Sequence, residues 1–140
     1  MKKRILIVDD EPHILKLLSE SFAGGETETA AALSGEEALD YARTHDLDLV
    51  ITDIMMPGLN GIQLFYDLKK LDPFLQIIII TGYPSLQHIA EMMEAGATDF
   101  IIKPFEIAKL KAVAAEAFSR VERWHALHDE WARKKRAAQA

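Results

Sequence analysis

The chain has 140 residues, no cysteine and a formal net charge of −6, so it is long enough for one domain with a sizeable core and excludes disulfides and thiolate chemistry. The acidic balance argues against direct nucleic-acid binding, because an acidic surface repels phosphate backbones. The basic start Met1–Arg4 meets Asp9 after four apolar residues, which is too short for a signal peptide, and no apolar run approaches the roughly 20 residues that cross a bilayer. We expect a soluble, cytoplasmic protein without membrane contact.

The first part of the chain predicts two strand–helix units. Arg4–Asp9 is a continuous apolar strand, and Pro12 suits the first turn of the helix that follows. The alternating segment Glu26–Ala32 is typical of a half-exposed edge strand. Ser34 and Glu37 have the spacing of a capping box at the start of a second helix.

Strands and helices continue to alternate in the second part. Leu47–Asp53 is the third predicted strand, and Met56–Gly61 holds several turn residues before a third helix. Leu75–Thr81, with four consecutive isoleucines, and Thr98–Lys103 are the fourth and fifth strands, and Gly96 caps the helix between them.

Beyond Pro104 the chain is helix-prone almost to its end, rich in alanine and charged residues and free of glycine and proline. Strands that alternate with helices favour βαβ units and a parallel sheet over hairpins. We therefore predict an α/β fold: a doubly wound five-stranded parallel sheet of flavodoxin-like type, order 2-1-3-4-5, with an extended C-terminal helix.

Polar residues collect where these strands end. Asp9 and Asp10 follow the first strand, and Asp53, Thr81 and Lys103 end the third, fourth and fifth. In the order 2-1-3-4-5 the first and third strands are neighbours, so the three acids converge at one edge. Close carboxylates are tolerated when some are protonated or a cation is bound, and oxygen ligands without histidine or cysteine favour Mg²⁺.

A carboxylate beside Mg²⁺ can attack phosphorus, because the metal and a lysine neutralise the phosphoryl oxygens. Asp53 is the candidate nucleophile and Lys103 the second cation, while the Thr81 hydroxyl can bond a phosphoryl oxygen after modification. Lys103–Pro104 is a candidate cis bond. Each residue alone has an ordinary explanation, such as an acid at a helix N-terminus, and only the joint pattern indicates function.

Four segments resemble the receiver domain of the response regulators of bacterial two-component systems. They are Ile5–Glu11, Val50–Gly58, Ile80–Gly82 and Ala95–Phe105. The resemblance covers about residues 4–122 and has all four motifs in order.

The resemblance implies a role for each site residue. Asp9 and Asp10 would hold Mg²⁺ together with Asp53 and the backbone carbonyl of Met55, and Asp53 would be phosphorylated by a histidine kinase, by a histidine phosphotransfer protein or by a small phosphodonor. Thr81 and Lys103 would engage the phosphoryl group, and the switch aromatic would be Phe100. Such a protein promotes its own phosphorylation and dephosphorylation and is a signalling switch rather than a turnover enzyme.

Other interpretations remain open. Phe100 is equally well explained by packing. An aspartyl-phosphate phosphatase would need a second acid where Met55 stands, and a nucleotide or flavin module would need a phosphate-binding loop where Asp9–Glu11 stand. A dimerisation adaptor that has the receiver fold and is never phosphorylated is the main alternative. Met55 and Tyr83 stand where many family members carry polar residues that help water reach the acyl phosphate, so we hypothesise a long-lived phosphorylated state.

The last predicted helix has apolar residues at alternating steps of three and four, the spacing of a coiled-coil seam. We expect a receiver domain over residues 1–123 and a helical extension over 124–140, which pairs with a second copy as a homodimer or leads to a downstream effector. A frayed, solvated tail is the alternative. His125 and His128 lack a third metal ligand, which favours a surface or interface role. The seam consists of Ile107, Leu110, Ala114, Ala117, Val121, Trp124, His128 and Trp131.

Overall fold

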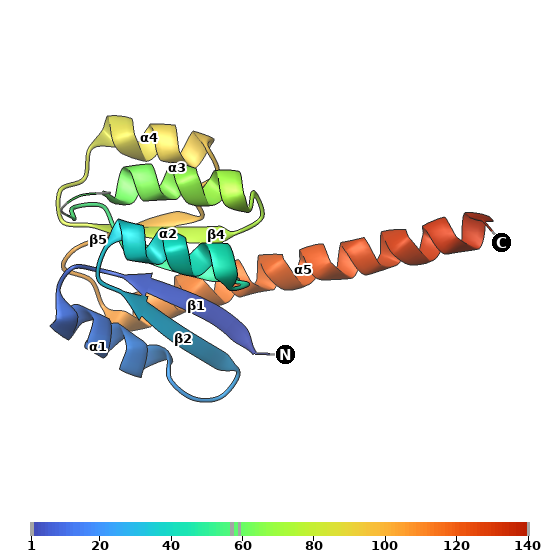
Figure 1. The fold of residues 1–140 in the computed structure, drawn as a ribbon, viewed down its shortest axis with the longest axis horizontal. Coiled ribbons are helices and arrows are strands. Elements are labelled where there is room, and N and C mark those ends of the chain that lie inside the picture. Colours follow the sequence, from blue (N-terminus) through green and yellow to red (C-terminus); the bar gives the residue numbers. More distant parts are fainter. Residues whose placement is uncertain (1, 57, 59, 140) are drawn as a thin grey trace.

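The computed structural model describes the whole chain except residues 1, 57, 59 and 140, and within that part it has one five-stranded sheet. All paired strands are parallel, in the order β2-β1-β3-β4-β5, which confirms the predicted doubly wound α/β fold (Figure 1). In chain order the elements are β1 (Lys3–Val8), α1 (Pro12–Phe22), β2 (Thr27–Ala32), α2 (Gly35–Thr44), β3 (Leu49–Asp53), α3 (Gly61–Leu71), β4 (Gln76–Thr81), α4 (Leu86–Glu94), β5 (Asp99–Ile102) and α5 (Ile107–Gln139).

Alternate residues of the central strands enter two separate cores. In β1, Leu6 and Val8 pack with α2, α3 and α4, while Ile5 and Ile7 pack with α1 and α5. A strand covered on both faces has no polar side, which is why β1 and β4 read as continuous apolar runs. The edge strand β2 is half-buried, as its alternating sequence predicted.

Side-chain caps begin three of the helices. The Ser34 hydroxyl accepts a hydrogen bond from the Glu37 amide at 3.1 Å, as predicted, although the Glu37 carboxylate returns to the amide of Leu33 rather than to that of Ser34. Asn60 and Ser85 cap α3 and α4 in the same way. Each cap satisfies an amide that the first helical turn leaves without a partner, so the helix starts are set locally.

Helix α5 is a single element of 33 residues. Its first half is buried at Leu110, Ala114, Ala117 and Val121, and its second half projects well beyond the sheet (Figure 1). The helix has no break near residue 123, so the expected boundary between domain and extension is not marked by the backbone. Among the described helices, including this one, none has the length and apolar character that a bilayer crossing requires.

Candidate functional site

Three carboxylates meet at the carboxyl ends of β1 and β3. Asp9 follows β1 and is 3% exposed, and Asp53 ends β3 and is 7% exposed. The two strands pair directly, with Val8 beside Thr52. One oxygen each from Asp9, Asp10 and Asp53 lies within 4.8 Å of the other two, so the strand order brings the predicted acids together.

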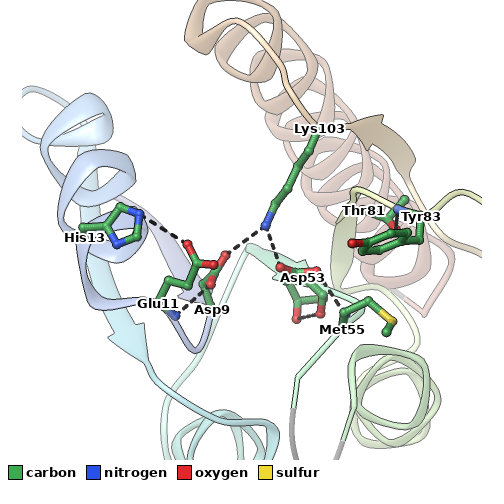
Figure 2. A network of polar contacts seen from close by, with 9 residues as sticks. Asp9, Glu11, His13, Asp53, Met55, Thr81, Tyr83 and Lys103 are labelled. Carbon is green, nitrogen blue, oxygen red and sulfur yellow. Dashed lines mark hydrogen bonds and ion pairs between the residues drawn. The ribbon is translucent and has the colours of Figure 1, made fainter.

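Lys103 reaches this cluster from the residue after β5, and its bond to Pro104 is cis. Its ammonium Nζ donates to Oδ2 of Asp53 at 2.7 Å and lies 3.6 Å from Oδ2 of Asp9 (Figure 2). Burial alone lowers the pKa of Lys103, but the hydrogen bond and charge of Asp53, followed by the charge of Asp9, outweigh burial and raise it. The lysine therefore stays protonated at neutral pH between the two acids.

The other carboxylate oxygen of each buried acid accepts a hydrogen bond from the backbone amide of the residue two positions later in the chain. Oδ1 of Asp9 accepts from the Glu11 amide at 2.9 Å, and Oδ1 of Asp53 accepts from the Met55 amide at 3.0 Å. The pKa of Asp9 is raised, chiefly by burial and then by the charges of Asp53 and Asp10, against the Glu11 amide and Lys103, which lower it. The amides thus orient both carboxylates while the surroundings disfavour the charge on Asp9.

The donor set fits a hard divalent cation. The cluster holds three carboxylates, of which Asp9 and Asp53 contact one lysine. All its candidate ligand atoms are oxygens, and Asp10 is exposed to solvent. Mg²⁺ prefers such oxygens and retains several of its waters, for which an exposed side of the cluster leaves space. Excess negative charge in a partly buried site is the condition that a bound dication relieves.

The remaining predicted residues lie around this cluster. Thr81 ends β4, is 1% exposed, and accepts a hydrogen bond from the Tyr83 amide at 3.0 Å through Oγ1. Met55 and Tyr83 are exposed at the rim, and the Met55 side chain points away from the Asp53 carboxylate (Figure 2). Phe100 is not part of the acidic cluster, because it packs half-buried against the core beneath α3 and α4.

Gly61 is a site residue that sequence reasoning treated only as a turn former. A Cβ at Gly61 would lie 2.6 Å from the Cα of Ile54 and closer still to the carbonyl oxygen of Asp53, so no other residue fits without moving the strand end that carries the acid. Gly82 is different, since a Cβ there would make an ordinary contact with Lys103 at 3.8 Å. Pro57 and Leu59 of the predicted turn lie outside the described residues.

The strand order and the lysine-bound acidic cluster beyond β1 and β3 define a doubly wound α/β protein with the receiver fold. Residues 5–115 match the family model of the response regulator receiver domain. The chain belongs to this family, whose members are signalling domains of two-component systems.

Known relatives and solved structures also support membership of the receiver domain family. The chain is 38% identical over 111 residues to sporulation initiation phosphotransferase F of Bacillus subtilis, covering 79% of this chain and 90% of the relative. It is 34% identical over 114 residues to the regulatory protein AtoC of Escherichia coli, covering 81% of this chain but 25% of that protein. A receiver domain structure from Clostridium thermocellum superposes with a TM-score of 0.81 at 30% identity, covering 87% of this chain and 98% of that one.

Proposed function

We propose that this chain is a phosphorylation-dependent switch in which Asp53 accepts a phosphoryl group. The observation that supports this most directly is the placement of Lys103 Nζ 2.7 Å from Asp53 within a cluster of three carboxylates. Asp9, Asp10 and Asp53, with the backbone carbonyl of Met55, would hold Mg²⁺. When bound, Mg²⁺ would neutralise charge on the phosphoryl oxygens.

The chain's own residues supply the rest of the reaction. A carboxylate oxygen of Asp53 forms a bond to phosphorus while the bond from phosphorus to the donor breaks, and the donor leaves with that electron pair. Lys103, already paired with Asp53, offers its charge to the transferred group. The Thr81 hydroxyl accepts from the Tyr83 amide and can still donate its proton to a phosphoryl oxygen.

The output is a change of binding surface. Modification replaces one carboxylate charge with nearly two charges and three acceptor oxygens, which favours a conformation that brings Thr81 and Lys103 toward the new group. Phe100 lies on β5, paired with β4 through Ile79 two residues before Thr81, and we propose that its ring shifts with that strand.

Family membership supports a proposal about the phosphoryl donor and about the role of the C-terminal extension. A histidine kinase or a histidine phosphotransfer protein would supply the phosphoryl group, as the name phosphotransferase of the Bacillus subtilis relative suggests. The chain covers about a quarter of the Escherichia coli relatives AtoC and ZraR, which are named as regulatory proteins. We propose that residues 1–123 form the receiver unit and that residues 124–140 connect it to an effector or to a second copy.

Intact mass spectrometry after incubation with acetyl phosphate and Mg²⁺ tests the proposal. The wild-type protein should gain one phosphoryl group, and neither Asp53→Asn nor the wild type in chelator should gain it, because the nucleophile or the metal is missing. Modification of Asp53→Asn to the wild-type extent would place the acceptor elsewhere. No gain in either protein would favour a dimerisation adaptor that is never phosphorylated.

Replacing Met55 with asparagine should shorten the lifetime of the phosphorylated protein several-fold. Met55 is 58% exposed at the rim of the site, where an amide can position the attacking water and a thioether cannot. Loss of the phosphorylated mass over time after removal of the donor measures the lifetime. Met93→Asn, at an exposed methionine of α4, is the control. An unchanged decay in Met55→Asn would contradict the hypothesis that Met55 prolongs the phosphorylated state.

A further inference from the structure

The second half of α5 carries an apolar face that the rest of the described chain covers only at its start, where Trp124 contacts Phe74. Leu127 is 61% exposed and Trp131 is 58% exposed, and with Trp124 they form one stripe at spacings of three and four. Residues 124–139 make about 24 Å of helix beyond the body. A lone helix of this length is marginal in water, so the exposed Leu127 and Trp131 of this straight helix indicate a covering partner.

The stripe continues from the buried seam of α5 into a groove at the base of the molecule. Trp124 packs edge-on against Phe74, with ring centroids 5.6 Å apart. Beside them is a cavity of about 330 Å³, here called the basal groove, at the edge of the sheet opposite Asp53. Its lining includes Leu47, Asp48, Asp72, Phe74, Trp124 and His128. The groove therefore combines apolar walls with two acidic side chains and two histidines, His125 and His128.

The charges along residues 124–139 favour one orientation of a second copy over the other. Four consecutive basic residues, Arg133–Arg136, lie in the last two turns of the helix. The ammonium of Lys135 lies 5.0 Å from the Trp131 ring on the apolar stripe itself. Parallel pairing of two copies would put Lys135 against Lys135 and one basic run beside the other, which is repulsive. Antiparallel pairing instead brings each basic run to the base of the other copy, where Asp48 and Asp72 line the groove.

We propose that the face formed by Trp124, Leu127 and Trp131 pairs antiparallel with the same face of a second copy, with each basic end at the partner's basal groove. The contact is isologous and closes as a twofold dimer, because both copies contribute the same stripe and the same groove. Pairing covers Trp131 and Leu127 on both helices, the surface that a lone helix leaves in water. This dimer does not depend on phosphorylation, so Asp53→Asn should form it unchanged.

Sedimentation equilibrium of the 140-residue chain tests the contact, with two matched variants that each add one carboxylate. Trp131→Glu should raise the dimer Kd at least about tenfold, because it removes the apolar ring and brings two like charges together at the centre of the dimer. Ala126→Glu, on the opposite side of the same helix, should change it less than about twofold. A wild type that stays monomeric at all concentrations, or equal effects of the two variants, would overturn the proposal.

Orientation is tested separately, since the natural chain has no cysteine. A spin label on Gln139→Cys should give a distance of about 24 Å or more between backbones in the antiparallel dimer centred near Trp131. A parallel pair would hold the labelled backbones about 10 Å apart, and that result would overturn the proposal. A monomer that binds anionic vesicles through Trp131 would likewise overturn it, in favour of a lipid surface.

Discussion

Replacing Lys103 with methionine should slow phosphorylation of Asp53 by acetyl phosphate about 10²- to 10³-fold. The ammonium lies 2.7 Å from Asp53 and 3.6 Å from Asp9, and among the described residues it is the cation paired with these acids. Methionine preserves most of the side-chain length and removes the charge together with the hydrogen bond to Asp53. A time course of intact mass at saturating Mg²⁺ measures the rate.

The same variant should bind Mg²⁺ more tightly than the wild type, because a cation that competes for Asp9 and Asp53 is gone. Slower phosphorylation combined with tighter Mg²⁺ binding would indicate a role of Lys103 in phosphoryl transfer, because simple damage to the site would weaken both. Lys111→Met, at an exposed lysine of α5, should leave both quantities unchanged. A Lys103→Met protein that is phosphorylated within about threefold of the wild-type rate would remove Lys103 from the reaction.

Replacing Asp9 with asparagine should stabilise the metal-free fold by about 1 kcal/mol and weaken Mg²⁺ binding at least about tenfold. Burial raises the pKa of Asp9 above its ordinary value of 3.8, so the ionised carboxylate opposes folding at neutral pH. At pH values between the ordinary and the raised pKa, the folded state holds a proton on Asp9 that the unfolded state has lost. Stability contributed by Asp9 therefore falls as pH rises from the ordinary value through the raised one.

Urea unfolding with and without Mg²⁺ measures both effects. The wild type should gain stability when Mg²⁺ is added, whereas Asp9→Asn should start more stable and gain less, because the metal binds only the folded state. Asp46→Asn, at an exposed acid away from the cluster, should behave as the wild type in both conditions. A less stable metal-free Asp9→Asn protein would show that the carboxylate's contacts with Glu11 and Lys103 outweigh its burial.

Much of the site could be predicted because each of its main residues stands at the carboxyl end of a different strand. Asp9, Asp53, Thr81 and Lys103 each lie within one residue of a strand terminus, and the strand order then decides which of them meet. Some observed strands begin or end one or two residues away from the predicted positions; β3, for example, begins at Leu49 rather than at Leu47. These differences do not move the four site residues away from the edge of the sheet.

Local patterns in the sequence by themselves determined the elements, the helix caps, the two-sided burial of the strands and the residue types at the sheet edge, because these depend on neighbours within a few positions. Only the tertiary structure decided which oxygen of each acid faces Lys103, why Gly61 cannot carry a side chain, and where α5 leaves the body. Those features are distances between parts of the chain far apart in sequence, and no periodicity along the chain encodes them.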